Sequence, residues 1–368
     1  MRIATFNLEN LDDGPDIRPP LSERIPVLAP MLERLDADIL CLQEVNAQRP
    51  PGVRERRLLA LEKLLDASAL RDYHLAVSSK RGGGGAAIYE NGRALRGGGA
   101  AIYENGRALR GGGAAIYENG RALRGGGKGL NDHHNLVTLS RLPIAASEQL
   151  WHDLVPEPRH AFVTADPAVK EAVPLTWERP VLYTRIEIAG RKPLHLFNVH
   201  LRAPLACAVP GQKADTFAWK TIGGWAEGYY LSEIKRAGQA FELRLALDRL
   251  FDDDPQAMIC IAGDFNAEEH HTPVEILRGE DDNTGNGALS FRVMVPVEHS
   301  LAADRRFTVI HQGRRQMLDH IMASRRLMGR YRGSEIHNEA LADELTGQVA
   351  VNPSPVSYHA PVVAVFDL

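Results

Sequence analysis

The sequence predicts an α/β (α+β) domain in which strands and helices form mixed layers. Short apolar or β-branched runs recur along the whole chain, and stretches with the helical spacing of Ile, Leu and Ala lie between some of them. No Ser-, Gly- or Pro-rich linker separates two halves of different composition, so we expect one domain over residues 1–368 with an insertion. A chain of 368 residues with 44% hydrophobic content is long enough to bury a large core.

Eight runs have the length and composition of core strands. In chain order they cover residues 2–7, 38–45, 135–140, 181–188, 193–201, 257–265, 317–324 and 360–366. Helical periodicity is clearest at 21–35, 55–70 and 229–251, where apolar residues recur among Lys, Arg and Glu. This alternation of strands and helices favours α/β layers.

Composition narrows the class of protein. The chain has 43 basic and 47 acidic residues, a net charge of −4, so no global basic field indicates nucleic acid, although a local patch could suffice. Three cysteines, two of them in apolar runs, are typical of a reducing compartment. No leader-like N-terminus and no run of eighteen apolar residues is present, so we expect a cytoplasmic protein without a membrane span.

A perfect tandem repeat occupies residues 83–127. The 14-residue unit GGGAAIYENGRALR begins at Gly83, Gly97 and Gly111. The Asn-Gly pair within each unit favours a two-residue hairpin turn, which would place Glu90 opposite Arg93 in the first copy. A short helix between glycines is the alternative, and the triple glycines would make either form mobile.

The repeat admits three interpretations. In the first, which we favour, it is a lengthened surface loop of the kind that tolerates insertions. It is a phosphate-binding segment, because residues 81–128 hold eight basic and three acidic residues. It is a self-association element with exposed strand edges.

Polar side chains stand at the ends of the expected strands, where burial without a partner would be costly. Asn7 and Glu9 end the first strand, and Glu44 ends the second, where its carboxylate could be a hard oxygen ligand for Mg²⁺. Asn198 and His200 share one strand face because they are two residues apart.

Further along the chain, Asp264 and Asn266 follow a glycine, Asp319 lies in the strand 317–324, and His359 precedes the last strand. Each residue alone is more typical of a turn or of a satisfied structural pair. The ordered set carries the functional interpretation.

This set resembles the endonuclease/exonuclease/phosphatase superfamily, which includes deoxyribonuclease I, abasic-site endonucleases, sphingomyelinases and inositol polyphosphate 5-phosphatases. In chain order the matching motifs are Phe6-Asn7, Gln43-Glu44, SRLP at 140–143, NVH at 198–200, GDFN at 263–266, LDHI at 318–321 and S-x-H-x-P at 357–361. They span the chain from its first expected strand to its last, the repeat excepted.

The resemblance implies a four-layer sandwich of two packed sheets flanked by helices, and Mg²⁺ or Mn²⁺ as cofactor. Glu44 and Asn7 would hold the metal, and Asp264 with Asn266 would position the attacking water and the phosphate. Asp319 would orient His359 toward the scissile phosphate, and His200 would act as general acid. The remaining substrate-binding candidates are Asn198 and Arg141.

One position departs from the family pattern, whose last motif reads Ser-Asp-His. Tyr358 stands at the position of that Asp. The missing carboxylate could weaken a second metal site or lower the proton affinity of the neighbouring histidine. The resemblance then implies reduced or altered activity, or a non-catalytic binding module.

Within a phosphoesterase, the substrate stays open between two groups. The arginine-bearing repeat and the aromatic and basic stretch from Trp219 to Arg236 favour a nuclease acting on DNA or RNA. The acidic net charge favours inositol or lipid phosphoesters, and an aromatic helix face packed on the core explains the same stretch without nucleic acid. The adjacent pairs His133-His134 and His270-His271 are interpreted as loop residues rather than zinc ligands.

Overall fold

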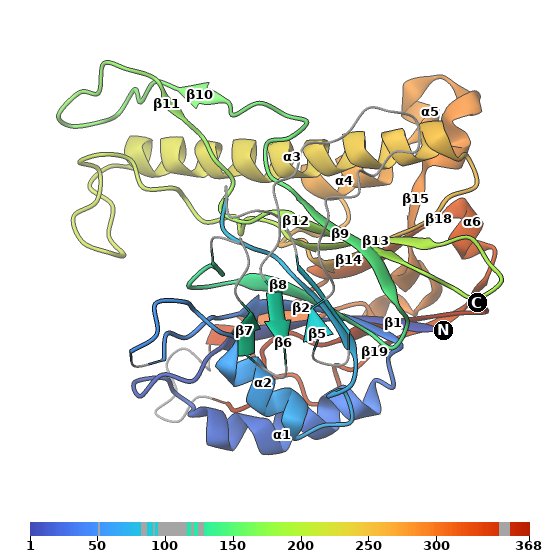
Figure 1. Cartoon of the computed structure of the whole chain (residues 1–368). Helices are drawn as coiled ribbons and strands as arrows, with labels where there is room; N and C mark the ends of the chain where they lie inside the picture. Colours follow the sequence, from blue (N-terminus) through green and yellow to red (C-terminus); the bar gives the residue numbers. More distant parts are fainter. Residues whose placement is uncertain are drawn as a thin grey trace.

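Two β-sheets packed face to face, each covered on its outer side by helices, form the core of the molecule (Figure 1). The computed structural model describes residues 1–50, 52–81, 87–90, 93–94, 116–118, 121–123, 129–345 and 354–368. The predicted four-layer α/β sandwich is therefore confirmed. None of the described helices is both long and apolar enough to cross a bilayer.

The larger sheet has the strand order β19-β20-β1-β2-β8-β3-β4-β5. Its strands are β1 Arg2–Leu11, β2 Ile39–Val45, β3 His74–Val77, β4 Ala87–Glu90, β5 Arg93–Ala94, β8 Asn135–Ser140, β19 Tyr331–Ile336 and β20 Val362–Phe366. β1 and β2 are parallel, whereas the other neighbours are antiparallel. The C-terminal ends of β1 and β2 therefore share one edge of the sheet.

The second sheet has the order β15-β18-β14-β13-β12-β9. Its strands are β9 Ile144–Leu150, β12 Val181–Ile186, β13 Leu194–His200, β14 Met258–Asp264, β15 Met294–Pro296 and β18 Asp319–Ser324. β13 and β14 are its parallel pair, so their C-terminal ends also meet. In the described part of the chain, three strand pairs form separate two-stranded sheets: β6 Ile116–Glu118 with β7 Arg121–Leu123, β10 Arg159–His160 with β11 Val173–Pro174, and β16 Val309–His311 with β17 Arg314–Gln316.

Helices α1 Leu21–Arg34 and α2 Leu59–Asp66 cover the larger sheet, and α3 Ile222–Asp253 with α4 Thr272–Arg278 covers the second. Two single turns, α5 Asp281–Thr284 and α6 Arg325–Met328, follow later in the chain. All eight expected strands form. α2 is shorter than the expected 55–70, and α3 begins seven residues before the expected 229.

The early start of α3 has a packing cause. Glycines at 223, 224 and 228 interrupt the helical pattern in the sequence. At Gly228, a Cβ would lie 2.2 Å from the carbonyl oxygen of Cys207, so only glycine lets that loop pack on the helix. A contact with a distant loop therefore overrides the low helix propensity of glycine.

Most of the repeat lies outside the described residues. In the described part, β4 and β5 pair Glu90 with Arg93, and β6 and β7 pair Ile116 with Leu123. The other expectations about the repeat, including self-association and phosphate binding, stay predictions.

The rows of side chains that face inward between the two sheets end in polar residues. Side chains alternate along a strand, so Ile3 of β1, Leu196 of β13 and Cys260 of β14 point into the apolar layer between the sheets. Continuing each inward row to the C-terminal end of its strand reaches Asn7, His200 and Asp264. The same alternation that builds the core thus delivers a polar cluster at one edge.

Candidate active site

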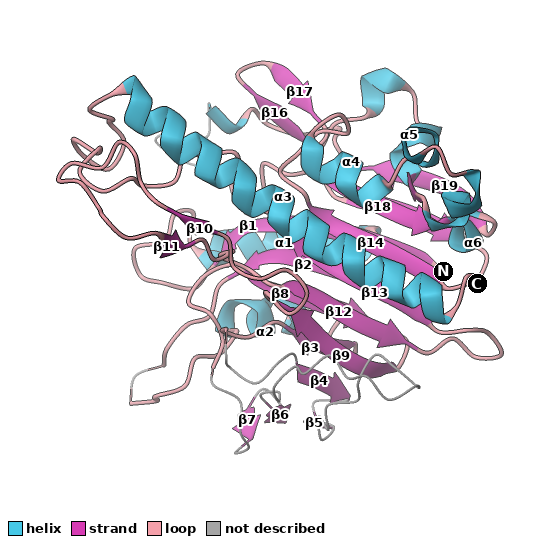
Figure 2. Ribbon diagram, turned by 90° about the horizontal axis from the view of Figure 1, so that it is seen from above, coloured by secondary structure: helices cyan, strands magenta, loops and turns pink. Residues whose placement is uncertain are grey.

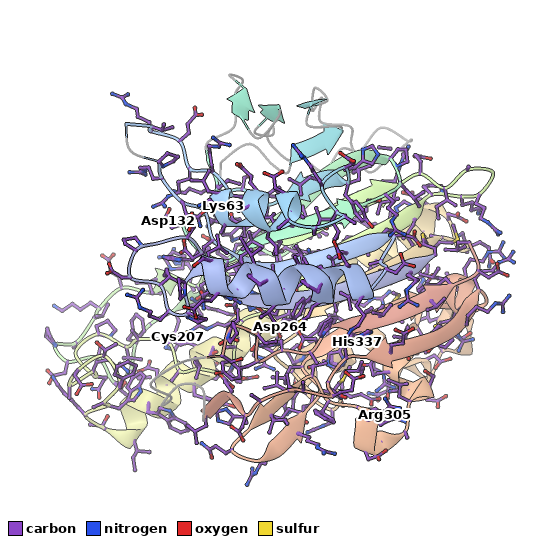
Figure 3. The ribbon with its side chains drawn as sticks, turned by 90° about the horizontal axis from the view of Figure 1, so that it is seen from below. Lys63, Asp132, Cys207, Asp264, Arg305 and His337 are labelled. Carbon is purple, nitrogen blue, oxygen red and sulfur yellow. The ribbon has the colours of Figure 1, made fainter. Side chains whose placement is uncertain are left out.

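Asp264, the last residue of β14, is the centre of this cluster; Figure 3 labels it between the blue N-terminal part of the ribbon and the yellow and orange second half of the chain. Its side chain is 1% exposed. One carboxylate oxygen, Oδ1, accepts the backbone N–H of Asn266 at 2.7 Å. The other, Oδ2, accepts the amide groups of Asn7 at 3.0 Å and Asn266 at 3.1 Å. Burial and the nearby carboxylate of Asp319 raise the pKa of Asp264 to about 7.

The backbone before Asp264 brings β14 unusually close to β13. Gly263 has a φ of 154°, and a Cβ there would lie 2.0 Å from the carbonyl oxygen of Val199. Glycine is therefore required at this position. The close approach puts Asp264 beside its register partner His200.

Glu44 lies beside Asp264, at the end of β2. Its Oε1 accepts the amide of Asn7 at 3.2 Å and its Oε2 accepts the backbone N–H of Asn10 at 3.0 Å. The amide oxygen of Asn7 accepts the backbone N–H of Glu9 at 2.8 Å. Asn7 therefore orients the Glu44 and Asp264 carboxylates with its NH₂ group. Its expected role at the metal stays a prediction.

Asp319 and His359 form the second half of the cluster. Asp319 is the register partner of Asp264 across β14 and β18, and its Oδ2 accepts the Nδ1 hydrogen of His359 at 2.8 Å. Burial opposes a charge on His359, but Asp319, Asp264 and Glu44 overcome it and raise the pKa of His359 to about 10. His359 is therefore an imidazolium at neutral pH, with Nε2 left for a ligand.

His200 has the opposite electrostatics. Burial and the neighbouring cation of Arg179 lower the pKa of His200 well below 6.5, so the ring is neutral. Its Nε2 lies 3.4 Å from Oδ2 of Asp264, and its buried Nδ1 has no hydrogen-bond partner. A neutral imidazole does not favour the general-acid role that the resemblance gives to His200.

The sequence reasoning missed two residues of the site, Arg179 and His134. Arg179 donates to Nδ1 of His134 at 2.8 Å and to the backbone oxygens of His200 and Leu201, both at 3.0 Å. The ring of His134 stacks on His200 with 5.6 Å between centroids. Arg179 precedes β12 without any motif, and an isolated Asp-His-His run is more typical of a loop, so no local signal identifies this pair.

Arg179 also fixes the chemistry of His134. A guanidinium only donates, so Nδ1 of His134 is an acceptor and the neutral ring carries its proton on Nε2. That Nε2 faces Oδ1 of Asn10 at 3.0 Å and Oε2 of Glu44 at 3.8 Å. His134, Glu44 and His200 are close enough to surround a metal, but a protonated Nε2 is not a ligand.

Left-handed backbone conformations gather at the site. Eight described residues other than glycine have a positive φ, and five of them lie here: Glu9, Asn10, Glu44, His134 and Asn266. Such conformations cost about 1 to 3 kcal/mol each unless the surroundings hold them. In folded proteins, strained positions of this kind cluster at functional sites.

Arg24 of α1 is one of the groups that hold this strained backbone in place. Its buried guanidinium donates to the backbone oxygens of Leu8 at 2.6 Å and Glu9 at 3.1 Å, and to Pro355 at 3.3 Å. One side chain thus ties the end of β1 to the segment that carries His359.

Two of the expected substrate-binding residues do not reach the site. Asn198 is fully buried between the sheets, where its amide donates to the backbone of Leu42 and Val137 and its oxygen accepts from Gln43. Asn198 therefore joins the two sheets and has no free polar atom for a substrate.

Asn266, the third expected substrate-binding residue, does lie at the site. Its NH₂ donates to Asp264 and to the backbone oxygen of Leu201, which leaves only its side-chain oxygen for a substrate.

Arg141 lies at the opposite edge of the larger sheet. β8 is antiparallel to β2, so Ser140 pairs with Ile39 at the start of β2, whereas Glu44 is near its end. Arg141 forms ion pairs with Asp36 at 2.7 Å and Asp38 at 3.1 Å. Chain order alone did not show that SRLP ends a strand running away from the site.

We expect Arg141→Ala to leave kcat and KM for any phosphoester substrate within about twofold of wild type, because Arg141 lies at the edge of the sheet opposite the site. The fold should also be retained, because exposed ion pairs contribute at most ~1 kcal/mol to stability. Steady-state kinetics checks this, with Arg179→Ala as the contrasting variant inside the site. A large rise of KM in Arg141→Ala would place it back among the substrate-binding residues.

Tyr358 is buried, with 7% of its surface exposed, and its hydroxyl accepts the backbone N–H of Ser354 at 3.3 Å. Its own backbone N–H donates to Oε2 of Glu9 at 2.7 Å. A carboxylate, that of Glu9, therefore lies against this segment although position 358 carries none. Burial raises the pKa of Glu9.

We expect Tyr358→Asp to lower the melting temperature without increasing turnover, because it would bury a new carboxylate beside that of Glu9. Tyr358→Phe, which removes only the hydroxyl, is the matched control. Differential scanning fluorimetry and initial rates test this; a gain in kcat for Tyr358→Asp would show that the tyrosine limits activity.

The donor set at this edge fits a hard divalent cation. The carboxylates of Glu44 and Glu9 lie close enough to interact electrostatically. Burial is the main cause that raises the pKa of Glu9 and of Asp264, and the carboxylate of Glu44 adds to it in both. Carboxylate oxygens suit Mg²⁺ or Mn²⁺. In the loop that follows Asn266, Glu268, His270 and His271 form another His and acid group, but Nδ1 of His271 already accepts the N–H of Glu268.

Comparison with known proteins agrees with this architecture. The profile of the Endonuclease/Exonuclease/phosphatase family matches residues 4–359. No curated protein matches the sequence significantly.

Among solved structures, a mannosyl-6-phosphatase from Bacteroides thetaiotaomicron aligns over 100% of both chains with 13% identity and a TM-score of 0.52. An endonuclease/exonuclease/phosphatase from Bacteroides vulgatus aligns over 100% of this chain and 98% of its own, with 13% identity and a TM-score of 0.52. TDP2 from Caenorhabditis elegans aligns over 99% of this chain and 73% of its own, with 12% identity and a TM-score of 0.50. At these identities the solved structures support the fold alone. The family profile, which spans nearly the whole chain and all the motifs that meet at this edge, shows that the protein belongs to the endonuclease/exonuclease/phosphatase family.

Proposed function

We propose that this chain is a divalent-metal-dependent phosphoesterase whose active site is the cluster around Asp264. The observation that carries the proposal is a geometric one: Asp264 of β14 lies opposite Asp319 of β18, and the carboxylate of Asp319 holds the ring of His359. Asp264 has a pKa of about 7, and His359, held by Asp319, has a pKa of about 10. A carboxylate that can act as a base and an imidazole that is cationic at neutral pH are groups that phosphate hydrolysis uses.

The residues divide the work as follows. Asp264 orients a water molecule and accepts its proton, because a carboxylate with a pKa near 7 is poised for that transfer at neutral pH. The amides of Asn7 and Asn266 fix the direction of that carboxylate. The imidazolium of His359 stabilises negative charge on the phosphoryl oxygens.

The proton for the leaving oxygen is assigned to His359 rather than to His200. His359 is protonated at neutral pH and an alkoxide is far more basic than its imidazole, so the transfer is favourable. The neutral His200 holds Asp264 from the side. A cation bound by Glu44, with Glu9 beside it, would supply Lewis-acid stabilisation of the phosphoryl group.

Two classes of substrate are proposed. The sequence favours a nuclease-type phosphodiesterase, for which the aromatic and basic stretch before and within α3 is the support. A lipid or inositol phosphoester is the second candidate, and an apolar surface beside the site, described below, favours it.

The test is hydrolysis of plasmid DNA, single-stranded RNA, inositol phosphates, phospholipid vesicles and bis-nitrophenyl phosphate, each with Mg²⁺, with Mn²⁺ and with EDTA. We expect turnover of at least one substrate that EDTA abolishes and that either metal restores. No metal-dependent turnover of any substrate would contradict the proposal and favour a non-catalytic binding module. Differential scanning fluorimetry with and without Mg²⁺ measures metal binding separately from activity.

A further inference from the structure

Exposed apolar side chains concentrate at one end of the molecule. Of ten large hydrophobic residues exposed in the described part of the chain, seven lie at or beside the N-terminal end of α3. Val163 is one, and the other six, which we call the α3 overhang, are Leu205, Phe217, Ile222, Trp225, Tyr229 and Tyr230. Phe217 is 91% exposed, Ile222 84% and Leu205 70%. A patch of this kind on a folded domain indicates an interaction surface.

The overhang is preformed rather than loosely attached. Thr221 caps α3 by accepting the N–H of Gly224 at 2.9 Å, and the N–H of Cys207 donates to the backbone oxygen of Gly228 at 2.8 Å. Glu227 accepts the backbone N–H groups of Val163 at 2.7 Å and Thr164 at 2.8 Å. Both flanking loops are therefore fixed to the helix.

The overhang stands at the active-site edge. α3 connects β13, which ends in His200, to the parallel strand β14, which ends in Asp264, so the helix runs back along the sheet and its first turns extend beyond the sheet on the side of those strand ends. Figure 2 shows these turns and the adjoining loops projecting beyond the sheets. Whatever covers the overhang is thus brought to the same side as Asp264.

The charges on the segment that carries the overhang are few. Between residues 203 and 230 the charged residues are Lys213, Asp215, Lys220 and Glu227. Glu227 is buried and faces His160 at 2.7 Å, so it does not contribute to the outer surface. Two lysines and one aspartate of this segment remain beside the apolar side chains, and the neighbouring loop adds Asp166, whose backbone N–H donates to Pro210.

We propose that the α3 overhang docks the protein on the surface of an anionic lipid membrane. Largely exposed aliphatic and aromatic side chains such as Leu205, Phe217 and Ile222, with lysines beside them, suit insertion at the boundary between headgroups and acyl chains. Single-stranded nucleic acid requires a denser track of cations and has no counterpart for Leu205 and Ile222. A second copy of the chain would need a flat complementary face, whereas this surface projects.

The docking surface bears on the substrate of the proposed phosphoesterase. This step rests on the proposed phosphoesterase function. Docking through the α3 overhang favours a phosphoester carried by a membrane amphiphile as substrate, because the docked protein would present Asp264 to the headgroup layer. Binding is measured without catalysis, so the two proposals fail independently.

The experiment is co-sedimentation of the full chain in EDTA with vesicles of phosphatidylcholine alone and of phosphatidylcholine with about one fifth phosphatidylserine, which adds surface charge. The test variant is Phe217→Ser with Ile222→Ser. Phe241→Ser, at a 47% exposed position further along α3, is the matched control. We expect wild type and Phe241→Ser to bind the anionic vesicles and the double variant to bind at least about tenfold more weakly. Hydrolysis of bis-nitrophenyl phosphate should be the same in all three.

Four outcomes would overturn the docking proposal: no vesicle binding by wild type, equal binding by the double variant, binding of a single-stranded oligonucleotide in place of vesicles, or a concentration-dependent dimer that the double variant abolishes. Vesicle binding together with absence of soluble turnover would leave docking in place and count against the phosphoesterase alone.

Discussion

Replacing Asp264 with alanine is expected to lower kcat by about 10³-fold or more, because it removes the base and the anchor of the hydrogen-bond cluster in one step. Asn7, Asn266 and His200 all face this carboxylate, and no other described side chain occupies its place. KM should change much less, since the imidazolium of His359 remains. Initial rates on bis-nitrophenyl phosphate measure the effect.

The fold should survive this substitution. A carboxylate whose pKa is raised in the folded state binds protons more tightly there than when unfolded, so above pH 7 its charge costs stability. Removing that charge offsets the lost hydrogen bonds. Asp282→Ala, at an exposed position, is the control, and more than a tenth of wild-type kcat in Asp264→Ala would remove Asp264 from the mechanism.

Asp319→Asn is expected to change the pH dependence of activity rather than only its size. Burial lowers the pKa of His359, and Asp319 is the largest opposing influence that raises it to about 10. Without that carboxylate the pKa of His359 falls, so the imidazolium is lost at a lower pH. We expect kcat of the variant to drop about 10²-fold at pH 7, and the ratio to wild type to fall further as the pH is raised to 9.

Stability gives a second readout of the same pair. In wild type, the raised pKa of His359 stabilises the fold fully below pH 6.5, and this contribution is lost as pH rises through about 10. Melting temperature against pH should therefore fall between pH 7 and 10 more steeply in wild type than in Asp319→Asn. Parallel pH profiles for both rate and melting temperature would show that Asp319 does not control the protonation of His359.

Much of the fold was readable from the sequence because it depends on local periodicity. All eight core strands follow from runs of apolar and β-branched residues, and the placement of Glu44, Asp264 and His359 at strand ends follows from polar residues that terminate those runs. The residues that close the cluster come from widely separated positions, and their grouping was inferred from a family resemblance rather than from spacing.

Tertiary structure decided what local patterns leave open. The sequence predicted Arg141 and Asn198 as substrate-binding residues. The antiparallel direction of β8 places Arg141 at the opposite edge of the sheet, and Asn198 is buried with both of its polar atoms hydrogen-bonded. Arg179 and His134 belong to the site only because two loops meet there. The sequence by itself determined which residues alternate into the core and which polar residues end each strand, since those depend on neighbours along the chain. Strand order, direction and the protonation of His200 and His359 depend on contacts between distant segments and on burial, so only the folded molecule decided them.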